Sequence, residues 1–130
     1  MLATIHSDAA PAAVGPYSQA VRYQGVLYLS GQIGLVPEEG RLVDDTLAGQ
    51  AKQVMQNLAA VLTAGGSALT DIIKVNIYLT DMADFPELNT LYANWLGEHR
   101  PARATVAVAA LPLGARVEMD IIARCAAGAD

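Results

Sequence analysis

The stretch from Leu47 to Thr80 decides the fold, and it reads LAGQAKQVMQNLAAVLTAGGSALTDIIKVNIYLT. In its first half, apolar residues recur three and four positions apart, which is typical of a helix with one buried face. These residues are Leu47, Ala51, Val54, Met55, Leu58, Val61 and Leu62. We expect Asp44 or Asp45 to cap the helix at its start, and Gly65 to provide a left-handed cap at its end.

The second half of the stretch predicts a strand, because apolar and polar residues alternate from Ile72 to Thr80. On the N-terminal side, Gln19–Tyr23 and Val26–Ser30 flank a Gln-Gly turn, a pattern that predicts a hairpin. The residues that follow, from 31 to 40, contain three glycines and a proline and are expected to form a loop.

On the C-terminal side we expect one more helix and two more strands. The helix begins near Asp84 and ends at Gly97, and its buried face is expected to hold Leu88, Leu91, Tyr92, Trp95 and Leu96. The strands are expected at Ala104–Ala109 and Arg116–Arg124, joined as a hairpin. This order of elements predicts an α+β fold, a two-layer sandwich in which both helices cover one face of a mixed sheet.

The other face of that sheet would then lack a cover. In the last two strands we expect the helix-facing residues to be Ala104, Val106, Val108, Val117, Met119 and Ile121. The opposite face would carry Arg103, Thr105, Ala107, Ala109, Arg116, Glu118, Asp120 and Ile122. Small apolar residues mixed with a few charges favour a subunit interface, so we predict a homo-oligomer with rotational symmetry.

Length and charge exclude several classes of protein. The 130 residues are expected to form a single domain over positions 1–130. With 13 acidic residues, 8 basic residues and a net charge of −5, the chain has too few cations for sequence-independent nucleic-acid binding. The single cysteine and the widely spaced His6 and His99 predict neither an intramolecular disulfide nor a metal site. No signal peptide or membrane span is readable, so we expect a cytoplasmic protein that does not bind membranes.

The residues that could carry chemistry are Arg103, Thr105 and Glu118. In an antiparallel hairpin, Glu118 would lie roughly opposite Thr105, and Arg103 would point to the same side. A guanidinium binds a carboxylate through two parallel hydrogen bonds, and a shielded carboxylate can hold or deprotonate a water. The set could therefore hydrolyse a small α-substituted acid. In the alternative interpretation, Asp120 lies opposite Arg103 and the two form only a cross-strand ion pair.

Several motifs resemble one known family. The segment Pro101-Ala-Arg-Ala-Thr105, followed by Leu-Pro at 111–112 and Val-Glu-Met at 117–119, is similar to the C-terminal signature of the RidA/YjgF family of reactive-intermediate (enamine/imine) deaminases. The run APAAVGPYSQA at 10–20, Ser-Gly-Gln-Ile at 30–33, and the helix bearing Asn89 and Tyr92 resemble the family too. The similarity extends from about Ile5 to Ala123.

The resemblance implies a homotrimer of chorismate-mutase-like fold with a cleft at each subunit boundary. It also implies hydrolysis of 2-imino or enamine acids, such as 2-iminopropanoate and 2-iminobutanoate, to 2-keto acids and ammonia, with no cofactor or metal. Arg103 would bind the substrate carboxylate and Glu118 would position and activate water. The other substrate-binding residues implied are Tyr17, Ser30, Gly31, Ile33, Asn89 and Thr105, the last of which is a cysteine in some relatives.

Two departures from the family pattern bear on the cleft wall. The stretch Gly97–Pro101 is shorter than in many members, and Arg100 stands where a phenylalanine often precedes the proline. Substrate preference is therefore left open. Two other functions are also weighed: a non-catalytic trimer that binds small acids or shields other proteins, and a ribonuclease or translation inhibitor. The acidic balance and the lack of a catalytic histidine pair argue against the latter.

Overall fold

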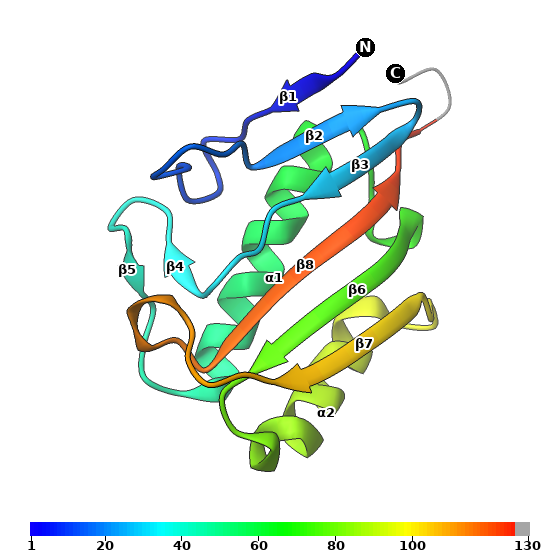
Figure 1. Cartoon of the computed structure of the whole chain (residues 1–130). Helices are drawn as coiled ribbons and strands as arrows, with labels where there is room; N and C mark the ends of the chain where they lie inside the picture. The colour runs from blue at the N-terminus through cyan, green and yellow to red at the C-terminus, as the bar shows by residue number, and fades with distance from the viewer. Residues whose placement is uncertain (127–130) are drawn as a thin grey trace.

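Residues 1–126 are described by the computed structural model, in which two helices cover one face of a β-sheet (Figure 1). The strands are β1 (Ala3–Ile5), β2 (Ala20–Tyr23), β3 (Val26–Leu29), β4 (Leu35–Val36), β5 (Arg41–Leu42), β6 (Ile72–Leu79), β7 (Ala102–Ala107) and β8 (Val117–Arg124). The helices are α1 (Leu47–Ala64) and α2 (Phe85–Leu96), and short 3₁₀ turns lie at Leu69–Asp71, Met82–Asp84 and Pro112–Gly114.

The main sheet has six strands in the order β1-β2-β3-β8-β6-β7, and β4 pairs with β5 separately. β6 and β7 run parallel, whereas the other neighbours in this sheet run antiparallel. The sheet is therefore mixed, and the predicted two-layer α+β sandwich is confirmed.

The core lies between the sheet and the helices. All seven apolar residues predicted on one face of α1 are buried, and Val54, Leu58 and Val61 are completely so. The alternation along β8 places Met119 and Ile121 in the same cluster. Residues with helical and with strand periodicity thus meet in one core, as their spacing predicts.

The ends of α1 differ from the prediction. The N-cap is Thr46 rather than Asp44 or Asp45: its Oγ1 accepts from the Gly49 N–H at 3.0 Å, and Asp44 Oδ1 in turn accepts from Thr46. A hydroxyl so placed satisfies a free amide of the first turn.

At the other end, Gly65 has a φ of −88°. The left-handed residue is Gly66, with a φ of 76°. Gly65 is needed for a different reason, because a Cβ there would approach Leu27 Cδ2 to 2.6 Å.

The predicted hairpin of the last two strands is wrong, because β6 lies between β7 and β8. Arg103 is paired with Val75 and Thr105 with Ile77, and both β6 partners face the helices. Arg103 and Thr105 therefore lie on the helix side, and the predicted faces of β7 are reversed. The six residues of this edge strand include three alanines, and five of the six are exposed, so its sequence lacks the alternation that identifies a face.

Two strand pairs were not expected from the sequence. β1 adds to the edge of β2, and β4 and β5 form a small hairpin that begins within the region predicted as a loop and ends just after it. The strands β4 and β5 have only two residues each, too few for a period to be read.

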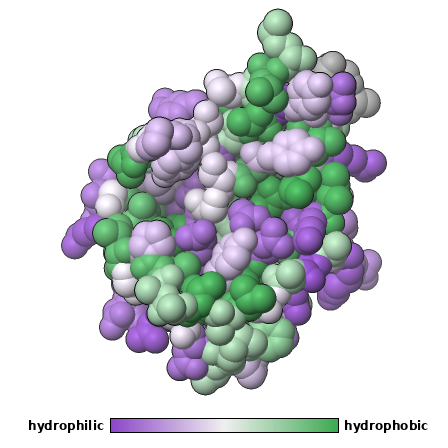
Figure 2. Space-filling view, in the orientation of Figure 1, coloured by the Kyte–Doolittle hydropathy of each residue, from purple (hydrophilic) through white to green (hydrophobic). Residues whose placement is uncertain are grey.

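Within residues 1–126 no helix lies over the other face of the sheet, which is turned toward the viewer in Figures 1 and 2. By register this open face carries Tyr28, Lys74, Asn76, Tyr78, Ala104, Val106, Glu118, Asp120 and Ile122. Figure 2 shows hydrophilic and hydrophobic groups side by side there. The predicted mixture is confirmed for β8, and the oligomer remains a prediction.

Among the helices of residues 1–126, none has the length and apolar character needed to cross a membrane.

Candidate functional site

Four of the residues predicted for the site line one hollow of about 380 Å³, called here the Glu118 pocket. They are Tyr17, Gly31, Ile33 and Glu118. The segment before β2, the segment after β3, the start of β8 and the Pro112–Gly114 turn meet there. The complete lining is Pro11, Ala12, Val14, Tyr17, Gln19, Gly31, Gln32, Ile33, Leu35, Pro112, Leu113 and Glu118.

Gly31 lies against the Glu118 side chain, next to a backbone bridge. In this bridge Gln32 N–H donates to the Met119 carbonyl at 2.8 Å, and Met119 N–H donates to the Gln32 carbonyl at 3.1 Å. A Cβ on Gly31 would lie 2.5 Å from Glu118 Oε2 and 3.0 Å from its Cδ. A larger residue at position 31 would therefore displace the Glu118 carboxyl from this position.

The Glu118 carboxyl is half-buried beside a second acid. Burial raises its pKa, and the negative charge of Asp120 raises it further. Asp120 itself is fixed, because Asn76 Nδ2 donates to Oδ1 and the Tyr78 hydroxyl donates to Oδ2, each at 2.9 Å. The hydrogen bond from Tyr78 to Asp120 is in turn the main reason why the pKa of Tyr78 is raised. Glu118 is thus held more basic than an exposed carboxylate.

A second hollow of about 480 Å³, called here the Arg103 pocket, lies where α2 meets the start of β7. Its lining consists of Asn89, Tyr92, Ala93, Arg100, Pro101 and Arg103. Arg103 and Asn89 are the predicted residues that it contains.

The Arg103 side chain is oriented by neutral groups. Its Nη1 donates to Asn89 Oδ1 at 2.7 Å. Its Cζ lies 4.9 Å from the centre of the Tyr92 ring and 5.5 Å from that of Phe85, within the range of cation–π attraction. The alternative interpretation, an ion pair with Asp120, is wrong, because Asp120 bonds to β6. The guanidinium is exposed and keeps its charge available for an anion.

Two predicted residues line neither hollow. Thr105 lies on the helix side of β7, and its Oγ1 is buried without a hydrogen-bond partner among the described residues. Ser30 donates from Oγ to the Ser18 carbonyl at 2.6 Å and from its backbone N–H to the Gln19 carbonyl at 2.9 Å. In a single chain, Ser30 therefore ties the end of β3 to the segment that carries Tyr17.

One chain does not bring Arg103 and Glu118 together. The two pockets share no lining residue. Glu118 lies on the open face of β8, whereas Arg103 lies on the helix side of β7, on the far edge of β6. The predicted convergence through a hairpin is wrong, and the two residues line separate pockets of one chain.

Sequence reasoning missed two lining residues of the Arg103 pocket. Tyr92 was predicted as core packing, and it is 6% exposed, yet its buried hydroxyl has no partner among the described residues. Arg100 was noted only as a departure from the family pattern. Its position three residues before Arg103, directly before the Pro-Ala-Arg motif, is the signal that could have indicated it.

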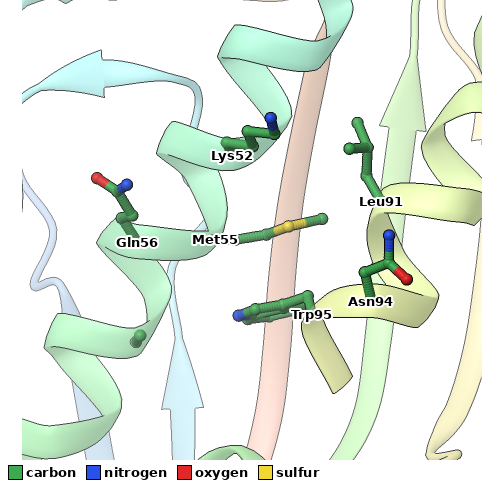
Figure 3. A pocket seen from close by; sticks show the side chains of 7 residues that line it. Lys52, Met55, Gln56, Leu91, Asn94 and Trp95 are labelled. Carbon is green, nitrogen blue, oxygen red and sulfur yellow. The ribbon is translucent and has the colours of Figure 1, made fainter. Parts of the chain in front are cut away.

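A third hollow, of about 490 Å³, lies between α1 and α2 (Figure 3). Met55 and Trp95 lie between the two helices, and Lys52 is the one charged residue of the lining. The hollow contains none of the predicted site residues. In residues 1–126, moreover, no three His, Cys, Asp or Glu side chains gather as metal ligands would.

Residues 7–125 match the family described as Endoribonuclease L-PSP. The 2-iminobutanoate/2-iminopropanoate deaminase of Mus musculus is 44% identical over 119 residues, covering 92% of this chain and 88% of that protein. Reactive Intermediate Deaminase A, chloroplastic, of Arabidopsis thaliana is 42% identical over 119 residues, covering 92% of this chain and 64% of that relative's length. The crystal structure of E. coli TdcF with bound serine has a TM-score of 0.90 at 35% identity, covering 95% of this chain and 99% of that one.

Proposed function

This chain belongs to the Endoribonuclease L-PSP family, which includes the RidA/YjgF reactive-intermediate deaminases, and we propose that it hydrolyses 2-imino acids to 2-keto acids and ammonia. Small substrates such as 2-iminopropanoate and 2-iminobutanoate are proposed first, because relatives named for the deamination of these two acids are above 40% identical to this chain. The observation that carries the proposal is Arg103, a cation that Asn89 and two aromatic rings orient and that forms no ion pair within residues 1–126.

The site is proposed to form between two copies of the chain, with the Arg103 pocket of one facing the Glu118 pocket of the next. The Arg103 pocket has no carboxylate in its lining, and the Glu118 pocket has no cation in its lining, so each supplies the group that the other lacks. Association of the chains would also cover the open face of the sheet. A closed ring would repeat this contact, so the proposed assembly is the chorismate-mutase-like homotrimer implied by the family.

Arg103 is proposed to bind the substrate carboxylate. A guanidinium can donate two parallel hydrogen bonds to a carboxylate, and Asn89 occupies only Nη1. Asn89 and Thr105 would contact the substrate on the arginine side. Tyr17, Ser30, Gly31 and Ile33 are proposed to line the acid side of the same cleft.

Glu118 is proposed to hold the attacking water and accept its proton. The water oxygen forms a bond to the imine carbon while the C=N π electrons move to nitrogen, which takes up a proton from solvent, giving a carbinolamine and protonated Glu118. Glu118 then returns its proton to the carbinolamine nitrogen. The C–N bond breaks with its electrons on nitrogen while the hydroxyl group releases its proton to solvent and becomes the keto group, so ammonia and the 2-keto acid leave. The raised pKa of Glu118 makes its carboxylate a stronger proton acceptor than an exposed one.

The catalytic demand is modest, because free imines already hydrolyse in water. Orientation of the imine beside a held water, together with proton transfer by one carboxylate, supplies the two effects that the reaction needs. A cofactor is not part of the proposal.

The test follows keto-acid formation from imines generated in situ, with an added amine trapping the imine that escapes. Arg103→Lys removes the paired donors and Glu118→Gln removes the base, so each is expected to lower kcat/KM by about 100-fold or more. The matched control is Arg41→Lys, since Arg41 is an exposed arginine paired with Glu39. Hydrolysis by both site variants at the wild-type rate would reject the proposal.

Binding without turnover is the second candidate, favoured by the bound serine of the TdcF structure. It predicts that 2-oxobutanoate raises the melting temperature of the wild-type protein while imine hydrolysis stays at the uncatalysed rate. The same two assays on one protein sample therefore separate the two candidates.

A further inference from the structure

The Arg103 pocket contains a second guanidinium, that of Arg100. Three of the other arginines are neutralised within the chain: Arg41 pairs with Glu39 at 2.5 Å, Arg116 with Asp45 at 3.8 Å and Arg124 with Asp71 at 2.8 Å. No such ion pair involves Arg100 or Arg103 in residues 1–126, and the lining of their pocket contains no Asp or Glu. Two uncompensated cations thus share one hollow in a chain of net charge −5.

Arg100 is held at the rim of this pocket by the backbone at the end of α2. Its Nη1 donates to the Gly97 carbonyl at 2.6 Å and to the His99 carbonyl at 2.9 Å. Gly97 ends the helix with a φ of 62°, which turns the chain toward β7. Both hydrogen bonds use one nitrogen, so Nη2 and Nε retain their donors for a ligand.

The Tyr92 hydroxyl reports the influence of both cations. Burial raises its pKa, and the charges of Arg103 and Arg100 each oppose that rise. The same hydroxyl is buried with no partner among the described residues. Both positive charges therefore act on the same part of the pocket, where they would favour an anionic ligand.

A ligand with one carboxylate would leave one of the two guanidiniums unpaired. A ligand with two carboxylates would neutralise both, and the negative total charge of the chain makes such local cations necessary for a dianion. We propose, building on the proposed function, that this protein prefers 2-imino dicarboxylic acids, with Arg103 binding the carboxylate beside the imine and Arg100 binding the distal one.

The reaction is unchanged by this preference. Water adds to the imine carbon, the C–N bond of the carbinolamine breaks, and the products are a 2-keto dicarboxylic acid and ammonia. Arg100 forms no bond to the reacting atoms, so it determines specificity and is not a catalytic residue.

The test compares 2-iminoglutarate with 2-iminopentanoate, which have the same number of carbons and differ in the distal carboxylate. For the wild-type protein we expect kcat/KM to favour the dicarboxylate by about 10-fold or more. Arg100→Gln replaces the guanidinium by an uncharged polar amide on a shorter side chain, and should lower that preference by about 10-fold, mainly through KM. Arg100→Lys should restore part of it, and the matched control Arg41→Gln should leave it unchanged.

Two results would overturn the inference: a wild-type preference for 2-iminopentanoate, or the same preference in wild type and Arg100→Gln. Hydrolysis of the monocarboxylate alone rejects the dicarboxylate preference and leaves the proposed function standing. If neither of these imines nor 2-iminopropanoate is hydrolysed, the proposed function fails, and thermal stabilisation by 2-oxoglutarate against 2-oxopentanoate decides the binding preference by itself. In that measurement, an equal shift in wild type and Arg100→Gln rejects the role of Arg100.

Discussion

Asp120 is an acid whose position is fixed so that its charge acts on a neighbour. Asn76 and Tyr78 each donate to one of its oxygens, and Glu118 lies two residues away on the same face. Lys74 on β6 and Tyr28 on β3 are the other titratable groups that the register places on this face near Ile122. The carboxylate of Asp120 is therefore the local charge that works with burial to keep Glu118 basic.

Asp120→Asn should shift the pH dependence of hydrolysis. Asp120 raises the pKa of Glu118, so removing its charge lowers that pKa and leaves Glu118 ionised at more acidic pH. The acidic limb of the kcat/KM profile should therefore move to lower pH, with a lower rate on the plateau because a less basic carboxylate accepts a proton less readily. Asp45→Asn, an exposed acid paired with Arg116, is the control. A limb that stays in place or moves to higher pH contradicts this role.

Single residues of the site were predictable where a motif carried them. Tyr17, Gly31, Ile33 and Glu118 lie together as the resemblance implies. The need for glycine at position 31 could not be derived, because it depends on a carboxylate that approaches from a strand almost ninety positions later in the chain. Which of Asp44, Asp45 and Thr46 caps the helix could not be predicted either, because the choice depends on the backbone geometry at the helix start.

At the scale of elements, α1 does more than cover the sheet. Its buried Asn57 donates from Nδ2 to the Leu35 carbonyl at 3.0 Å and to the Ile33 carbonyl at 3.4 Å. Two helical turns earlier, the backbone of Gln50 leaves no room for a Cβ on Gly34, which would come within 2.8 Å. The helix thus fixes the segment that lines the Glu118 pocket.

Asn57→Ala should destabilise the fold. The change leaves two carbonyls of the Ile33–Leu35 segment without their buried donor, so we expect the free energy of unfolding to fall by about 2 kcal/mol. Urea denaturation measures the loss. Gln56→Ala, an exposed amide on the same helix, should change the free energy by less than about 0.5 kcal/mol. Equal effects of the two substitutions would show that Asn57 does not hold the segment.

The elements that the sequence predicted are those with a strong period. α1 and β8 each bury one regular set of residues, and their faces are confirmed. β7 has alanine on both faces, so its sequence does not show which face is buried. Its pairing with β6 instead of β8 depends on contacts between residues far apart in the chain, which a local pattern does not contain. That one error explains why the predicted trio was expected to converge within one chain.

At the scale of the whole molecule, the proposed site between two chains makes a prediction about mixing. Arg103→Lys and Glu118→Gln are each expected to be inactive, yet assemblies containing both kinds of chain would include some clefts built from two intact halves. Random co-assembly in a ring should restore about a quarter of the wild-type activity. The assay uses the two variants co-expressed at equal levels and purified together through one tag that both carry.

The control co-expresses wild type with a chain that carries both substitutions. Sites between copies again leave about a quarter of the activity per cleft, whereas sites within one chain leave about half. No recovery in the first mixture, together with one half in the second, would mean that each chain carries a complete site.

The position of β6 between β7 and β8 also ties turnover to protein concentration. Under the proposed arrangement, a dissociated protomer retains both the anion-binding and the proton-accepting group but cannot apply them to the same molecule. Specific activity should therefore decline on dilution below the dissociation constant of the assembly and recover on reconcentration. Because β6 separates the two groups within each chain, self-association would switch the reaction on.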